Sequence, residues 1–165
     1  MLEQCLANTF HLSSFRTGQR EIINAIMQKK DVLAVLPRGG GKSLCYQFPI
    51  VYQKKLGIII SPLVALMKDQ VSALRKKGIP CGCLYSGQPD AEKREVFSQI
   101  SNGSTYLLYL SPERVQKEGF RNWVAHKDIA LFAVDEAHCV SQWGHDFRSD
   151  YSELKVLKTI KPDIP

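Results

Sequence analysis

The stretch Leu36–Gln47, LPRGGGKSLCYQ, places three consecutive glycines directly before a lysine and a serine. Glycine loses more conformational freedom on folding than any other residue, so the run indicates that another group approaches this backbone closely. An apolar run, Asp31–Leu36, precedes the glycines, and a segment of helical length, Gly41–Tyr52, follows them. Backbone N–H groups of such a loop can surround a phosphate at the positive end of the helix dipole. The stretch therefore predicts a phosphate site between a strand and a helix.

Two side chains at the end of this stretch suit a nucleoside triphosphate with magnesium. Lys42 would neutralise the outer phosphates, and the Ser43 hydroxyl would bind Mg²⁺. The pattern G-x-x-x-x-G-K-[ST] fails at its first position, where Leu36 stands. A plain glycine-rich turn therefore remains the alternative. The backbone predicted to line the phosphates belongs to Arg38, Gly39, Gly40 and Gly41.

Strand-like and helix-like segments alternate along the chain. Short apolar runs bounded by Gly, Pro, Ser or Asp are typical of strands buried on both faces. The predicted strands are Asp31–Leu36, Gly57–Ile60, Thr105–Leu110, Ile129–Val134 and, as the weakest candidate, Cys81–Tyr85. The predicted helices are Arg16–Lys29, Gly41–Tyr52, Pro62–Lys77, Asp90–Ile100 and Pro112–Ala125. This alternation predicts one α/β domain over residues 1–165, a mostly parallel sheet with helices on both faces and ligands at the carboxyl ends of its strands.

Composition narrows the class of protein. Lysine and arginine number 22 against 16 acidic residues, a net charge of +6, which favours a polyanionic partner, although solubility alone explains it equally well. The five cysteines are irregularly spaced, which argues against a disulfide framework and for a reducing compartment. The N-terminus lacks the features of a signal peptide, and no apolar run approaches about 20 residues. We expect a cytoplasmic or nuclear protein with no membrane partner.

A pair of carboxylates follows the apolar run Ile129–Val134. Asp135 at a strand end can hold a metal ion through water. Glu136 beside it can accept a proton from an attacking water. A solvated turn is the alternative for an isolated pair, but it fits poorly with the phosphate loop upstream.

At this point the residues carry a family resemblance. Residues 135–151, DEAHCVSQWGHDFRSDY, resemble motif II and the adjoining aromatic-rich loop of RecQ-family DNA helicases. Residues 36–49 resemble the family's motif I, residues 61–71 (SPLVALMKDQV) its motif Ia, and residues 110–115 (LSPERV) a further motif of its first lobe. Residues 15–19, FRTGQ, resemble its adenine-recognition motif. The motifs follow the family's order across nearly the whole chain.

The resemblance implies a RecA-like P-loop NTPase lobe, the first motor lobe of a superfamily 2 DNA helicase of DEAH-box type. Such an enzyme uses ATP and Mg²⁺ to move 3′ to 5′ on DNA in repair or recombination. Its partners would be single-stranded and partly duplex DNA, and a second motor lobe later in the same chain. Lys42, Asp135 and Glu136 would be catalytic, and Ser43 with Asp135 would hold the metal. Arg16 and Gln19 would read the adenine.

The aromatic-rich loop and motif Ia are the expected DNA contacts. Stacking side chains beside a cation suit unpaired bases, at about 1 to 3 kcal/mol per stacked base. These side chains are Trp143, His145, Phe147 and Arg148. Core packing of Trp143 and Phe147 is the alternative. Ser61, with Lys68 and Gln70, would contact the DNA backbone. By position, His138 would couple the nucleotide site to this loop.

Two departures from the family pattern have consequences. Arg38 stands where the family usually has threonine, and its charge would either pair with phosphate or obstruct the nucleotide. We expect weakened turnover with binding retained. Pro165 comes just before the family's motif III strand, which would lie between the strands of Leu33 and Val134. We therefore expect a lobe truncated before that strand, because a gap of one strand, about 4.8 Å per pairing, cannot close. Without the second lobe's arginines, hydrolysis would be slow.

Three other functions remain open. A P-loop kinase for a small molecule would explain the lysine, serine and Asp135, but it leaves the aromatic-rich loop without a task. A hydrolysis-impaired module that only clamps nucleic acid would follow if Arg38 abolishes turnover. A purely structural α/β domain has no specific feature in its favour.

Overall fold

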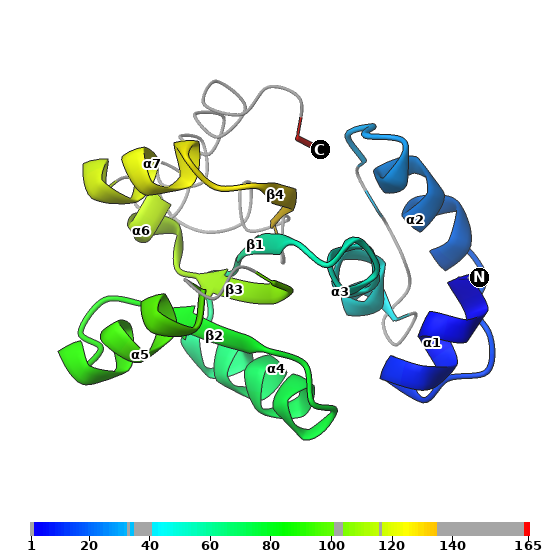
Figure 1. Ribbon diagram of the computed structural model, residues 1–165, viewed down its shortest axis with the longest axis horizontal. Helices are drawn as coiled ribbons and strands as arrows, with labels where there is room; N and C mark the ends of the chain where they lie inside the picture. The colour runs from blue at the N-terminus through cyan, green and yellow to red at the C-terminus, as the bar shows by residue number, and fades with distance from the viewer. Residues whose placement is uncertain (1, 33, 35–40, 101–103, 116, 135–163) are drawn as a thin grey trace.

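The computed structural model describes residues 2–32, 34, 41–100, 104–115, 117–134 and 164–165. Within these ranges three helices come first, and from there strands and helices alternate, with two helices before the last strand (Figure 1). In chain order they are α1 (Leu2–Phe10), α2 (Gln19–Met27), α3 (Lys42–Gln53), β1 (Leu56–Ile60), α4 (Val64–Lys76), β2 (Cys81–Leu84), α5 (Asp90–Ile100), β3 (Tyr106–Leu110), α6 (Pro112–Val115), α7 (Glu118–Ala125) and β4 (Ile129–Val134).

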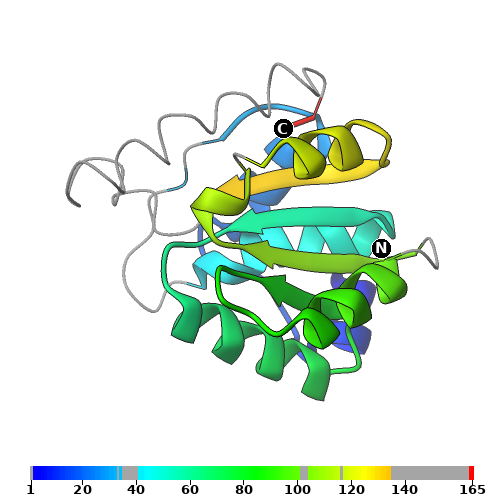
Figure 2. The same cartoon turned by 90° about the vertical axis from the view of Figure 1, so that its left-hand side faces the viewer.

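The four described strands form one parallel sheet in the order β2-β3-β1-β4, which Figure 2 shows from its side. Every residue of the central strands β1 and β3 is buried. Ile58 in β1 pairs with Leu108 of β3 on one side and with Phe132 of β4 on the other. Continuous apolar strands of this kind are typical of parallel sheets covered on both faces. The predicted parallel α/β fold is confirmed.

Helices cover both faces of the sheet (Figure 1). On one face, α3 and α4 lie against the sheet and α1 and α2 pack outside α3; together they bury side chains such as Phe10, Ile23 and Met67 in one apolar cluster. On the other face, α5, α6 and α7 do so with Val96, Val115 and others. Each face therefore has its own apolar core, which places α3, the helix of the predicted phosphate site, firmly within the first.

One predicted strand is absent where the structure describes it. Asp31, Val32 and Ala34 form no strand, and among the described strands β4 pairs with β1 alone. On the other edge of β4, the Phe132 N–H donates to the Pro165 carbonyl oxygen at 2.9 Å. A strand needs a hydrogen-bonded neighbour, and none of these three residues pairs with a described strand. The missing strand expected between those of Leu33 and Val134 stays a prediction, because Leu33 lies outside the described residues.

The helices differ from prediction at two places. Helix α1 was not predicted, although Leu2, Leu6 and Phe10 recur at intervals of four and could have indicated it. The segment predicted as one helix, Pro112–Ala125, forms α6 and α7, because Lys117 adopts an extended conformation (φ −71°, ψ 129°) before α7. No glycine or proline marks this break, so the local pattern could not predict it.

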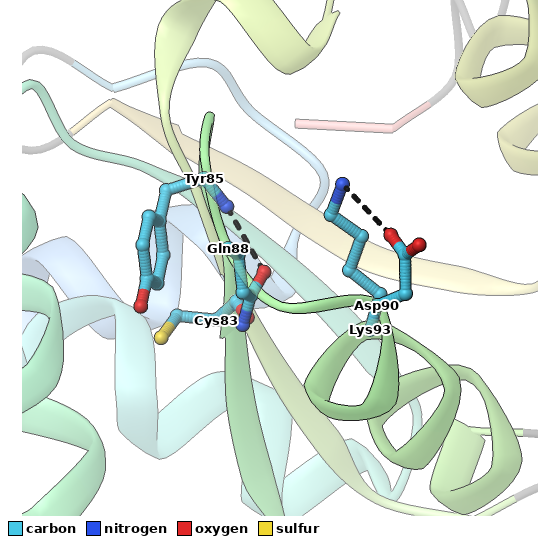
Figure 3. A network of polar contacts seen from close by, with 5 residues as sticks. All are labelled: Cys83, Tyr85, Gln88, Asp90 and Lys93. Carbon is cyan, nitrogen blue, oxygen red and sulfur yellow. Dashed lines mark hydrogen bonds and ion pairs between the residues drawn. The ribbon is translucent and has the colours of Figure 1, made fainter.

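Strand β2 ends the described sheet, and side chains close its outer edge. The Gln88 side chain is buried there; its Nε2 donates to the Cys83 carbonyl oxygen at 2.9 Å, and its Oε1 accepts from the Tyr85 N–H at 3.3 Å (Figure 3). The Arg75 guanidinium donates to the Cys81 carbonyl oxygen at 3.1 and 3.3 Å. Gln88 thus takes the place of a neighbouring strand, which protects the edge from pairing with other chains.

Replacing Gln88 with alanine is expected to lower the free energy of unfolding by about 1 to 2 kcal/mol, because two backbone groups lose their partner. Urea unfolding measures this change. The exposed Gln4 of α1 provides the control, since Gln4→Ala should change the free energy of unfolding little. Equal losses in the two variants would contradict the proposed sealing of the edge.

Candidate functional site

Helix α3 begins where the predicted phosphate loop ends. Gly41 precedes its first residue, Lys42, with a left-handed backbone (φ 77°, ψ 39°) and no side-chain cap. The first N–H groups of a helix have no partner within the helix, and its N-terminus carries a partial positive charge. Lys42 is exposed and Ser43 is half-buried at this end. The described part of the loop therefore presents backbone donors, an ammonium group and a hydroxyl at one place.

The Gln19 side chain ties the loop to the FRTGQ segment. Its Nε2 donates to the Gly41 carbonyl oxygen at 3.0 Å, and its Oε1 accepts from the Arg16 backbone N–H at 2.6 Å. A Cβ at Gly41 would lie 2.2 Å from Gln19 Nε2, so the close approach explains the glycine. The reading of adenine by Gln19 and Arg16 stays a prediction. The structure adds a second role for Gln19, whose side chain positions Gly41.

The rest of α3 is a rigid base for its first turn. All seven residues from Leu44 to Ile50 are buried, as in a helix covered on every side. Among them, burial raises the pKa of the Cys45 thiol to about 11. The thiol is therefore neutral at physiological pH and adds no negative charge next to the predicted phosphate position.

A polar chain leads from Ser43 into the interior. The Ser43 Oγ accepts from Gln70 Nε2 of α4 at 3.1 Å, and Gln70 Oε1 accepts from Gln47 Nε2 at 2.9 Å. Gln47 Nε2 also donates to the Tyr109 hydroxyl at 3.1 Å. Both ends of the Gln70 amide therefore bind other side chains of the protein in this structure. The contact of Gln70 with DNA stays a prediction. Lys68 is instead exposed on α4 and lies 5.0 Å from the centre of the Tyr85 ring.

The carboxyl ends of β1 and β3 carry further polar groups. Ser61 follows β1; it is only 2% exposed, its N–H donates to the Leu110 carbonyl oxygen at 2.9 Å, and its hydroxyl lies 3.5 Å from the Leu63 N–H. Ser61 thus shapes the turn after β1, and its contact with DNA stays a prediction. After β3, Ser111 Oγ and Arg114 Nε are buried without a hydrogen-bond partner among the described residues. Neither Ser111 nor Arg114 was predicted as a site residue, although both lie in the motif of residues 110–115.

The remaining predicted site residues lie outside the described part of the chain, so their roles stay predictions. They are Arg38, Gly39, Gly40, Asp135, Glu136, His138, Trp143, His145, Phe147 and Arg148.

Residues 16–164 match the model of the DEAD/DEAH box helicase family. The chain belongs to this family. It is 44% identical over 160 residues to the ATP-dependent DNA helicase RecQ of Haemophilus influenzae, a match that covers 97% of the chain and 26% of that protein. It is 46% identical over 169 residues to the ATP-dependent helicase SGS1 of Saccharomyces cerevisiae, covering 97% of the chain and 12% of that protein. The resemblance to RecQ helicases is confirmed.

The helicase relatives are much longer than the chain, which spans about a quarter of the bacterial one. A solved structure shares the fold of this DEAD/DEAH box domain: a hypothetical ATP-dependent RNA helicase from Sulfolobus tokodaii, with a TM-score of 0.71. The match covers 99% of this chain and 47% of that one, at 18% sequence identity. At that identity the similarity concerns the fold, which confirms the RecA-like lobe.

The magnesium ion expected in this helicase domain stays a prediction, because Asp135 lies outside the described residues. No group of three or more histidine, cysteine or acidic side chains gathers in the described part of the chain. A softer metal such as zinc has no cluster of ligands there. Hydroxyl and carboxylate oxygens are the ligands that Mg²⁺ prefers, and the predicted pair, Ser43 and Asp135, would supply them.

None of the described helices is long and apolar enough to cross a membrane.

Proposed function

We propose that this chain is the ATP-binding motor lobe of a DNA helicase that moves 3′ to 5′ on single-stranded DNA in repair or recombination. One observation carries the proposal: in a member of the DEAD/DEAH box family, the exposed Lys42 and the half-buried Ser43 begin the first turn of α3, directly after the left-handed Gly41. A triphosphate at that turn meets backbone donors and a fixed positive charge. The residues belong in a nucleotide site more readily than in any structural role.

Each site residue has a task in ATP hydrolysis. The Lys42 ammonium binds the outer phosphate oxygens and offsets the charge that grows on them during transfer. The Ser43 hydroxyl and the Asp135 carboxylate would hold Mg²⁺, which would supply additional positive charge to offset that of the phosphates. Glu136 accepts the proton of the attacking water, and Gln19 with Arg16 binds the adenine. A second lobe of the longer protein supplies the arginines that complete the site.

DNA is proposed to bind across the carboxyl ends of the strands. After β3, Arg114 Nε and Ser111 Oγ are buried and have no hydrogen-bond partner among the described residues, and such atoms in a folded protein call for a partner, a water or a ligand. We propose that the Arg114 guanidinium meets a phosphate group of the DNA backbone. Trp143 and Phe147 of the aromatic-rich loop would then stack on the bases. His138, before this loop, would couple the bound DNA to the nucleotide site.

Replacing Arg114 with alanine is expected to weaken binding of a labelled single-stranded oligonucleotide about tenfold, because a charge-assisted hydrogen bond to phosphate is lost. The slope of log affinity against log salt should fall by about 1, since one fewer counterion is released. Fluorescence anisotropy at several salt concentrations measures both quantities.

The exposed Arg94 lies in the middle of α5 and not at the carboxyl end of a strand. It provides the matched control, and Arg94→Ala should leave the affinity and the slope nearly unchanged. Equal effects of both variants would mean that DNA responds only to net charge. Binding that does not depend on salt would contradict the proposed nucleic-acid site altogether.

A clamp that binds nucleic acid without hydrolysing ATP is the second candidate. The charge of Arg38 inside the phosphate loop is the feature that favours it. A small-molecule kinase is less favoured, because the helicase family match covers residues 16–164 and the identity to a RecQ protein extends over 97% of the chain. For either DNA-binding function we propose the cytoplasm of a prokaryote or the nucleus of a eukaryote as its location.

A further inference from the structure

Three polar side chains between α3, α4 and β3 form a continuous hydrogen-bonded chain that ends at Ser43. From the interior outward, the Tyr109 hydroxyl accepts from Gln47 Nε2 at 3.1 Å, Gln47 Nε2 also donates to Gln70 Oε1 at 2.9 Å, and Gln70 Nε2 donates to Ser43 Oγ at 3.1 Å. Tyr109 is fully buried and Gln47 is 6% exposed. We call these residues, Tyr109, Gln47 and Gln70, the glutamine relay.

The structure gives each amide of the relay one orientation. Gln47 Nε2 donates to Gln70 Oε1, so Gln70 turns its nitrogen to Ser43. An amide nitrogen only donates hydrogen bonds, and Ser43 Oγ is therefore the acceptor in this arrangement. A serine hydroxyl has one proton and two lone pairs. With one lone pair held by Gln70, no other described residue takes the second lone pair or the proton of Ser43.

We propose that Gln70 is a positioning residue that orients the Ser43 hydroxyl for Mg²⁺ and a phosphate oxygen, and that Gln47 and Tyr109 lock its amide in that orientation. The inference rests on the proposed nucleotide site, where Ser43 holds the metal. In this arrangement the free lone pair of Ser43 faces the metal, and its proton is free to donate to a phosphate oxygen.

Packing alone does not explain these residues. A partly buried polar network is costly when any member lacks a partner, and apolar side chains of similar volume would fill the same space between α3 and the sheet without that cost. Partners that orient a metal ligand, in contrast, commonly change metal affinity by about 10- to 100-fold. The relay fits the role of orienting a metal ligand, because each of its hydrogen bonds restricts the Gln70 amide that donates to Ser43.

The test measures how much Mg²⁺ strengthens ATP binding to the full chain. The dissociation constant of a fluorescent ATP analogue is determined with Mg²⁺ and with EDTA, and the ratio of the two is the magnesium gain. Gln70→Leu is expected to lower this gain about tenfold, while the affinity in EDTA stays unchanged. A loss of packing would instead weaken binding under both conditions.

A double-mutant cycle assigns the effect to Ser43. In the Ser43→Ala background, Gln70→Leu should have no further effect on the magnesium gain, because the hydroxyl that it orients is absent. Gln4→Leu on the exposed face of α1 is the matched control, with the same substitution in a helix and an unchanged gain. Should Gln70→Leu not fold, Tyr109→Phe removes one hydroxyl only and should lower the gain in the same direction.

The outcomes separate this inference from the proposed function. A full magnesium gain in Gln70→Leu, or an equal loss in the presence and absence of the Ser43 hydroxyl, overturns the positioning role while the nucleotide site stands. If the unmodified chain itself shows no magnesium gain, the nucleotide site fails, and the inference fails with it.

Discussion

Replacing Lys42 with alanine is expected to weaken the binding of ATP with Mg²⁺ by about 10- to 100-fold. Lys42 is the exposed first residue of α3, and no ion pair engages its ammonium group within the described ranges. Its charge is thus available to a phosphate at the helix N-terminus, where a charge-assisted hydrogen bond is strongest. Titration with a fluorescent ATP analogue measures the change directly.

The control for Lys42 is the exposed Lys30 after α2. Lys30→Ala removes the same charge from the same chain, so it should change ATP affinity little if the effect is local. Thermal unfolding of the Lys42→Ala variant should match the unmodified chain, because an exposed side chain contributes little to packing. Unchanged ATP binding in the folded variant would refute the nucleotide site.

Replacing Gly57 with alanine is expected to lower the free energy of unfolding by about 1 to 3 kcal/mol. Gly57 lies in β1 opposite α3, and a Cβ there would lie 2.0 Å from Ile50 Cδ1 and 2.3 Å from Ile50 Cγ1. Ile50 is fully buried, and a β-branched side chain in a helix has essentially one rotamer. Either the sheet or α3 must therefore move. Urea unfolding measures the loss.

Gly119 of α7 provides the opposite case in the same protein. It is exposed, and no atom lies within 4 Å of the position of its Cβ. Gly119→Ala is expected to raise the free energy of unfolding by up to about 1 kcal/mol, because alanine restricts the unfolded chain and favours the helix. Equal effects at Gly57 and Gly119 would show that the space between β1 and α3 does not limit the fold.

Most of the fold could be predicted from local pattern. The strands β1, β3 and β4 are continuous apolar runs, and α5 was predicted with the bounds it has, Asp90–Ile100. Such segments carry their own signal, because a strand buried on both faces has no polar face. The run Asp31–Leu36 carries the same signal and yet forms no strand at the residues described, since a strand also requires a neighbour that the local pattern does not contain.

The candidate site likewise combines residues that the local sequence pattern predicts with residues that only the packing reveals. Lys42 and Ser43 could be singled out from their spacing alone, because a glycine loop before a helix is a local feature. Ser111 Oγ and Arg114 Nε, in contrast, which lack a partner among the described residues, are recognised only when burial is known. The bonds of the Gln70 amide to Gln47 and Ser43 could not be predicted either, because helical spacing does not fix what a half-buried glutamine meets.

By itself, the sequence determined which runs must be buried and which side chains are candidates to bind a phosphate, a metal ion and a base. Only the tertiary structure decided that Gln19 holds Gly41, 22 residues away, and that Gln70 holds Ser43, 27 residues away. The reason is physical. These partners lie on different elements, and the packing of α2, α3 and α4 on one face of the sheet alone sets the distances between them.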